Sequence, residues 1–153
     1  MLSRVATIVA CNETVALPAM FERYAQIDQA SYEVASLEPP PALVALAAAK
    51  TERVLAPVWA RIIRMRPGDY LLAHHDHEHG DHRVELILDL SPSVVPDAEV
   101  RYRRNGKVFF RFPSQPGHAS IVERDGATQA YHTYVSKLHP DAMVLRLVLL
   151  LAD

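Results

Sequence analysis

Residues 64–90 read RMRPGDYLLAHHDHEHGDHRVELILDL, and this stretch decides the fold. It joins a Pro-Gly turn, an apolar strand pattern, a dense group of histidines and carboxylates, and a second strand pattern. Five of the eight histidines of the chain lie between positions 74 and 82. Because side chains at i and i+2 of an extended strand point to the same side, we expect His74 and Asp76 to present an imidazole and a carboxylate together. Such a pair is half of a metal site.

The chain downstream of this stretch is typical of antiparallel strands. From Ala60 onward apolar residues recur with the two-residue period of a strand. Asn105-Gly106 separates two such runs and is the strongest short-range indication of a hairpin. Six or seven antiparallel strands after a helical start predict a mainly β fold, a double-sheet jelly roll. The predicted strands, with two in the N-terminal part, are residues 4–11, 32–36, 83–90, 100–104, 107–112, 118–123, 131–138 and 143–150.

The N-terminal part is expected to support the jelly roll from outside. Apolar residues at helical spacing predict a helix over about residues 17–28. The alanine-rich stretch over residues 41–55 follows a run of prolines and predicts a second helix. The length of 153 residues favours one domain, with helices in residues 1–59 packed outside a jelly-roll core of residues 60–153.

Composition excludes several classes of partner. The chain has 16 lysines and arginines against 18 aspartates and glutamates, and it has no long block of like charge. Neither nucleic acid nor a membrane surface is therefore expected as a partner. Cys11 is the only cysteine, so no internal disulfide forms, and residues 1–14 are too interrupted for a signal peptide. These features predict a cytoplasmic protein.

Two later residues complete the constellation. His132 lies in a late predicted strand, where a jelly roll can return to His74 and its neighbours. Arg146 lies in the apolar run MVLRLVLLL, where an unpaired charge costs several kcal/mol. An arginine fork binds a carboxylate through two hydrogen bonds. The partner of Arg146 is therefore expected to be a dicarboxylate cosubstrate or, if their side chains do not face solvent, Asp89 or Glu85. Two histidines and a carboxylate on one side of a metal suit non-haem Fe(II) and oxygen chemistry.

In this order, the residues resemble the Fe(II)- and 2-oxoglutarate-dependent oxygenases, most of all their prolyl-hydroxylase-like and aspartyl-hydroxylase-like branches. The order is Gly68-Asp69-Tyr70, His74-x-Asp76, Arg83, Pro116-Gly117, His132 and Arg146. The resemblance covers about residues 60–153. It implies a double-stranded β-helix in which His74, Asp76 and His132 bind Fe(II). It also implies that Arg146 holds the far carboxylate of 2-oxoglutarate.

The activity implied by this resemblance is hydroxylation of an unactivated C–H bond in a small molecule, amino acid or peptide. Oxidative decarboxylation of 2-oxoglutarate by O2 would yield succinate and CO2. Fe(II) and 2-oxoglutarate are then the cofactors, with ascorbate in a supporting role. No catalytic residue is expected beyond the metal ligands. Tyr70 and Tyr134 are candidate contacts of the cosubstrate.

Two other functions remain open from the residues. Gly68 followed by His75-x-His77 resembles the first cupin motif, which implies a three-histidine metal centre without 2-oxoglutarate. Alternatively, the tract HHDHEHGDH belongs to a non-catalytic protein that captures Ni(II) or Zn(II). A buried cation at Arg146 separates the oxygenase from both, since neither needs it. Residues 77–82 are expected to form a loop beside the metal, and His118 and His139 are rivals of His132.

Overall fold

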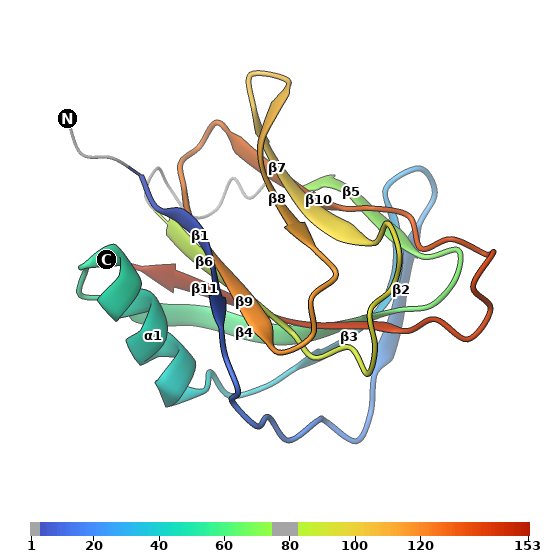
Figure 1. Cartoon of the computed structure of the whole chain (residues 1–153), viewed down its shortest axis with the longest axis horizontal. Helices are drawn as coiled ribbons and strands as arrows, with labels where there is room; N and C mark the ends of the chain where they lie inside the picture. Colours follow the sequence, from blue (N-terminus) through green and yellow to red (C-terminus); the bar gives the residue numbers. More distant parts are fainter. Residues whose placement is uncertain (1–3, 75–82) are drawn as a thin grey trace.

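The computed structural model describes residues 4–74 and 83–153, the side chains of residues 73 and 74 excepted, and shows one strongly curled antiparallel β-sheet (Figure 1). The elements are, in chain order, β1 (Ala6–Ala10), β2 (Glu22–Gln26), β3 (Ala30–Ser36), α1 (Pro41–Thr51), β4 (Ala56–Met65), β5 (Tyr70–His74), β6 (Arg83–Asp89), β7 (Glu99–Arg104), β8 (Lys107–Pro113), β9 (His118–Arg124), β10 (Thr128–His132) and β11 (Val144–Ala152). The protein is thus mainly β, as the two-residue period predicts.

The strands from β4 onward pair as nested hairpins, which is the arrangement of a jelly roll. β4 pairs with β11, β5 with β10, β6 with β9, and β7 with β8. One half of the sheet has the order β9-β6-β11-β4, and the other has the order β5-β10-β7-β8. β3 joins the halves because it pairs with both β4 and β5. The result is a nearly closed antiparallel barrel, consistent with the predicted jelly roll.

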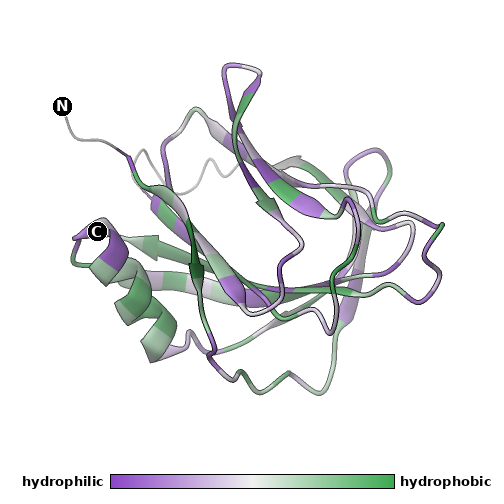
Figure 2. Cartoon of the chain, in the orientation of Figure 1, coloured by the Kyte–Doolittle hydropathy of each residue, from purple (hydrophilic) through white to green (hydrophobic). Residues whose placement is uncertain are grey.

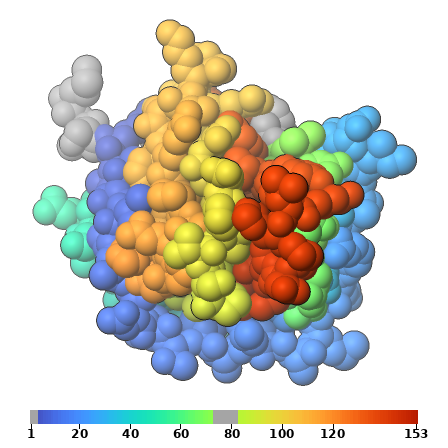
Figure 3. Space-filling view, turned by 45° about the vertical axis from the view of Figure 1, so that its right-hand side comes forward, coloured from blue at the N-terminus to red at the C-terminus, as the bar shows by residue number. Residues whose placement is uncertain are grey.

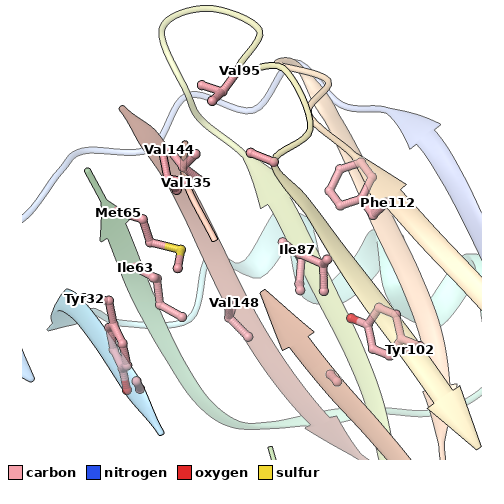
Figure 4. Close-up of a cluster of buried hydrophobic side chains, with 14 of the residues drawn as sticks. Tyr32, Ile63, Met65, Ile87, Val95, Tyr102, Phe112, Val135, Val144 and Val148 are labelled. Atoms are coloured by element: carbon pink, nitrogen blue, oxygen red, sulfur yellow. The ribbon is translucent and has the colours of Figure 1, made fainter. Parts of the chain in front are cut away.

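Alternate residues of the central strand β11 belong to two different cores. Val144 and Val148 pack in the cluster inside the barrel (Figure 4), whereas Leu147 packs in a second cluster outside it. α1 covers this second cluster, and apolar residues are concentrated in the helix and the strands beneath it (Figure 2). Because side chains alternate along a strand, Arg146 shares the inward face with Val144 and Val148.

The N-terminal part corrects one prediction, because the helix expected over residues 17–28 is a strand. β2 lies there, is exposed along its length, and pairs with β3. Met20 and Ile27, which were expected to cover a sheet, are 83% and 89% exposed. Backbone hydrogen bonds to the free edge of β3 override the helical spacing of these apolar residues.

The second predicted helix is confirmed as α1, the single helix in the described ranges, so "helices" in the plural was wrong. Pro41 suits the first helical position, where its missing N–H has no partner to lose. Leu43 and Ala47, one turn apart, are fully buried. No helix among the residues described is long and apolar enough to cross a membrane. The cytoplasmic location stays a prediction.

Two further strand predictions have different outcomes. The hairpin at Asn105-Gly106 is confirmed, with φ angles of 54° and 76° in the turn between β7 and β8. The strand expected over residues 131–138 ends at His132, so only its first two residues belong to β10. The chain then crosses the surface beside β5 and the loop after β6 (Figure 3), and Val135 donates its backbone N–H to the carbonyl of Asp69, 2.9 Å away.

Candidate functional site

The polar face of β6 lies inside the barrel. Ile87 packs in the inner cluster, whereas Leu86 and Leu88 pack in the outer one. Because residues alternate, Glu85 and Asp89 share the inward face with Ile87, and they are only 4% and 2% exposed. The two-residue period of this strand is therefore confirmed, and the structure places its carboxylates in the interior instead of in solvent.

His132 and Arg146 meet inside this barrel. Nη1 of Arg146 lies 2.9 Å from Nδ1 of His132. The two residues are 5% and 2% exposed. A guanidinium only donates hydrogen bonds, so Nδ1 accepts, and a neutral His132 carries its proton on Nε2. The structure thus brings together two of the residues predicted from the sequence, one from the end of β10 and one from β11.

The first predicted ligand pair lies at the edge of what the structure describes. The last residue of β5, His74, pairs through its backbone with Ala130 of β10, and Leu71 pairs with His132. Paired residues have Cα atoms roughly 5 Å apart, and Ala130 is two residues from His132 along β10, so the backbone of His74 lies close to that of His132. Asp76 and the rival ligands at positions 75–82 lie outside the described residues, as does the His74 side chain. Among the side chains that are described, no group of three potential metal ligands occurs.

Arg146 is a buried cation, and the groups around it compensate its charge only in part. Burial lowers its pKa from the usual value of arginine to about 10, and the nearby Asp89 carboxylate opposes this effect. Arg146 therefore stays charged at neutral pH. Asp89 lies opposite Arg146 in the ladder, but its carboxylate oxygens accept the backbone N–H groups of Ser91 and Gln115, at 2.9 and 2.8 Å. Within the described part of the chain, Arg146 forms no ion pair within 4.0 Å, so it keeps donors for an anion.

A cavity opens inside the barrel beside His132. Its polar and aromatic lining comes from Tyr32, Trp59, Arg61, Glu85 and His132, and the remaining lining residues are aliphatic. Three strands of one half (β4, β6 and β11) and two of the other (β5 and β10) contribute lining residues, with β3 between the halves. The cavity therefore combines one candidate metal ligand with an apolar wall and a few charged groups, as ligand sites commonly do.

The other candidates do not line this cavity. Tyr70 is partly buried at the start of β5, where its backbone pairs with Ser31, and Tyr134 is 51% exposed after β10. His118 lies at the start of β9, with its ring near the carbonyl of Pro116, and His139 is exposed. Both tyrosines stay predictions as contacts of the cosubstrate.

One group of interior residues was not predicted as part of the site. Glu85 accepts hydrogen bonds from the Tyr102 hydroxyl at 2.5 Å and from Nη1 of Arg124 at 2.9 Å. The side chains of Glu85 and Arg124 are at most 5% exposed. Burial and the Glu85 charge raise the pKa of Tyr102 well above its usual value. The sequence signal was the place of Glu85 two residues before Ile87, on the face that proves to be internal.

Comparison with known proteins gives a fold but no sequence relative. No family model and no curated protein matches the chain. An oxidoreductase of the 2OG-Fe(II) oxygenase family from Burkholderia pseudomallei is similar in structure, with a TM-score of 0.67, 12% identity, and coverage of 87% of this chain and 73% of that chain. The chain shares the fold of 2OG-Fe(II) oxygenases. The structural likeness therefore shows the fold that the sequence resemblance implies.

Two further structures frame this result. The viral collagen prolyl hydroxylase from Paramecium bursaria Chlorella virus-1, in its 2OG complex, gives a TM-score of 0.61 at 13% identity, with coverage of 83% of this chain and 82% of that chain. A predicted oxalate decarboxylase from Thermotoga maritima gives 0.50 at 12% identity, with coverage of 87% and 92%. Function must be argued from the site, because at such identities one fold accommodates several chemistries.

Proposed function

We propose that the protein is an Fe(II)- and 2-oxoglutarate-dependent oxygenase that hydroxylates a small molecule, amino acid or peptide, with release of succinate and CO2. The observation that carries this proposal is the meeting of His132 and Arg146 inside the barrel. A ligand of the metal and an anchor for a cosubstrate that chelates the same metal have to lie close together on the inner wall. Neither a cupin nor a metal-capture protein needs a buried arginine there.

The chain's donor set suits Fe(II). Two imidazoles and one carboxylate, from His74, His132 and Asp76, leave positions open for other ligands. When bound, the metal and 2-oxoglutarate supply the oxidising chemistry. The protein supplies position and shielding: Arg146 orients the far carboxylate of 2-oxoglutarate, and the aliphatic wall of the cavity excludes water. Tyr70 and Tyr134 are proposed as further contacts of the cosubstrate.

The contact between Arg146 and His132 is informative about this assignment. A neutral imidazole carries one proton, so a ring that ligates through Nε2 must be protonated on Nδ1 and can no longer accept there. If the ring ligates through Nδ1, the lone pair of Nδ1 is used by the metal and can no longer accept a hydrogen bond from Arg146. In both cases Arg146 leaves His132 and turns to another acceptor. The carboxylate of the cosubstrate fits that requirement, because the charge-assisted hydrogen bonds of an arginine fork are strong.

Binding measurements on single variants test the proposal. Mn(II) can stand in for Fe(II), and isothermal titration calorimetry reports its stoichiometry. We expect Asp76→Ala and His132→Ala to lose stoichiometric metal, whereas the matched control His118→Ala keeps it. We expect Arg146→Leu to keep the metal and weaken 2-oxoglutarate binding by roughly 10²-fold, the loss of a desolvated, bidentate ion pair. Release of succinate from 2-oxoglutarate and O2 with candidate substrates then tests the reaction itself.

The likeness to the predicted oxalate decarboxylase supports one alternative, a cupin-type metalloenzyme that does not use 2-oxoglutarate. It predicts the opposite pattern of losses. His75→Ala and His77→Ala would remove the metal, Asp76→Ala would keep it, and Arg146→Leu would leave binding of 2-oxoglutarate unchanged or undetectable in every form. That pattern would replace the oxygenase assignment.

A further inference from the structure

A second arginine faces the barrel interior. Arg61 lies on β4, between Trp59 and Ile63, which both pack against the inner cluster, and it lines the same cavity as His132. Its Cζ atom lies 3.8 Å from the centroid of the Trp59 ring. Ile63, Val148 and Tyr32, which line the same cavity, lie near one another in the inner cluster (Figure 4). Stacking holds the guanidinium in place and leaves the N–H groups at its edge for a ligand.

The charge of Arg61 is not neutralised by the other charged group in the cavity lining. Both carboxylate oxygens of Glu85 are taken up by the Tyr102 hydroxyl and by Arg124. Within the ranges described, Arg61 forms no ion pair within 4.0 Å. The interior therefore presents a cation toward the cavity, which an anionic ligand would compensate.

A neighbouring arginine shows what a structural role on this strand looks like. Arg64 lies on the opposite face of β4 and donates from Nη2 to Glu33 at 2.7 Å. Its Cζ atom lies 4.0 Å from the centroid of the Phe21 ring. Arg64 thus has the aromatic contact that Arg61 has, together with an internal carboxylate that Arg61 lacks among the described residues. It is a matched control for experiments on Arg61.

The ladder places Arg61 close to Arg146. Arg146 pairs with Ile63, and Val148 pairs with Arg61, so the two arginines are diagonal neighbours on the inner face of adjacent strands. Diagonal neighbours lie roughly 7 to 8 Å apart. Arg61 lines the cavity and Arg146 does not, although His132 contacts Arg146 and lines the cavity too. Since only Arg61 lines the cavity, these two inward cations at this spacing indicate two separate anion sites near His132.

We propose that Arg61 binds a carboxylate of the primary substrate, which is therefore a small organic acid whose carboxylate is attached to an apolar or aromatic body. This inference rests on the proposed function, in which Arg146 is already engaged by the cosubstrate. The aliphatic wall from Leu71 and Val148, together with Tyr32, receives the apolar body. A neutral compound of the same shape leaves Arg61 uncompensated and binds weakly.

The proposal is tested with two probes of nearly the same shape, the acid 3-phenylpropionate and its neutral amide 3-phenylpropionamide. Calorimetry measures binding of each probe to the metal-free protein and to the protein with Mn(II) and saturating 2-oxoglutarate. Trp59 is the only tryptophan, so its fluorescence provides a second readout in the wild-type protein. We expect the acid to bind and the amide not to bind. Arg61→Gln should weaken binding of the acid by roughly tenfold or more, Arg61→Lys should weaken it less, and Arg64→Gln should not change it.

Three results would overturn the proposal: no binding of the acid to the wild-type protein, equal affinity for acid and amide, or unchanged affinity in Arg61→Gln. Competition between 3-phenylpropionate and 2-oxoglutarate would overturn it too, because the acid would then occupy the cosubstrate site. The proposed function fails separately, through absent binding of Mn(II) or 2-oxoglutarate. If the acid nevertheless binds in a way that depends on Arg61, Arg61 does form an anion site. The assignment of that site to the substrate of an oxygenase would then be overturned.

Discussion

Replacing Arg146 with methionine is expected to stabilise the metal-free protein while removing its affinity for 2-oxoglutarate. Burial lowers the pKa of Arg146 from the usual value of arginine to about 10. At about 1.4 kcal/mol per pKa unit, keeping this cation charged in the fold costs about 3 kcal/mol. The lost hydrogen bond to His132 offsets about 1 kcal/mol of the gain. The variant should therefore be about 2 kcal/mol more stable, which corresponds to a Tm roughly 4 to 8 °C higher.

The pH dependence has a defined sign. The pKa of Arg146 is lower in the folded than in the unfolded protein, so the penalty is fully present below about pH 10. The penalty shrinks as pH rises from about 10 toward the usual pKa of arginine, where the unfolded chain also loses the proton. Between neutral pH and about pH 9 the advantage of the variant should therefore be constant. Urea unfolding with EDTA present, followed by circular dichroism, measures it.

Leu147→Met is the control, because Leu147 is the outward neighbour on the same strand and a volume-conserving change there costs less than about 1.5 kcal/mol. Thermal shifts with Mn(II) and 2-oxoglutarate complete the experiment: the wild-type protein and the control should be stabilised, and Arg146→Met should not respond to 2-oxoglutarate. Destabilisation of Arg146→Met by more than about 1 kcal/mol would refute the reasoning on burial cost. An undiminished response to 2-oxoglutarate would refute the assignment of the anchor.

Three other changes probe the barrel by urea unfolding. Glu85→Gln leaves Arg124 buried without its ion-pair partner and should cost about 3 kcal/mol; adding Arg124→Met should recover much of this. Burial alone would raise the pKa of Asp125, but hydrogen bonds, led by that from Arg4, lower it to about 2. Asp125→Asn should thus lose at most about 2 kcal/mol at neutral pH, and the difference should vanish as pH falls from about 4 through 2. Gly106→Ala should cost about 1 kcal/mol, because φ is +76° and no atom obstructs the added Cβ.

The burial of Arg146 could be predicted from sequence, whereas that of Glu85 could not. The run around Arg146 is apolar on both faces, so every orientation buries the guanidinium. On β6 the alternation separates two faces correctly, but it does not say which one is internal when both are covered. Arg61 was missed for a related reason: an arginine in the middle of β4 cannot be told from a solvated charge until the curvature of the sheet is known.

The N-terminal error has a different physical origin. Leu17, Met20 and Ile27 have helical spacing, yet all three are exposed. A local pattern cannot include the free edge of β3, whose partner is decided by tertiary structure. His132 was found because few histidines lie outside the cluster at 74–82. The pair His74 and Asp76 stays a prediction, and the metal measurements decide it.

The bridging strand β3 has a consequence for how the barrel opens. Within the described residues, strand pairing joins the two halves of the sheet only through β3, and the ladder of β3 with β5 has just two residue pairs, Ala30 with Leu71 and Ser31 with Tyr70. Short ladders open at low free energy, so amide protons there should exchange before those of the long β4–β11 ladder. Since Tyr32 of β3 and Leu71 of β5 both line the cavity, we expect opening of this short ladder to change the width of the cavity.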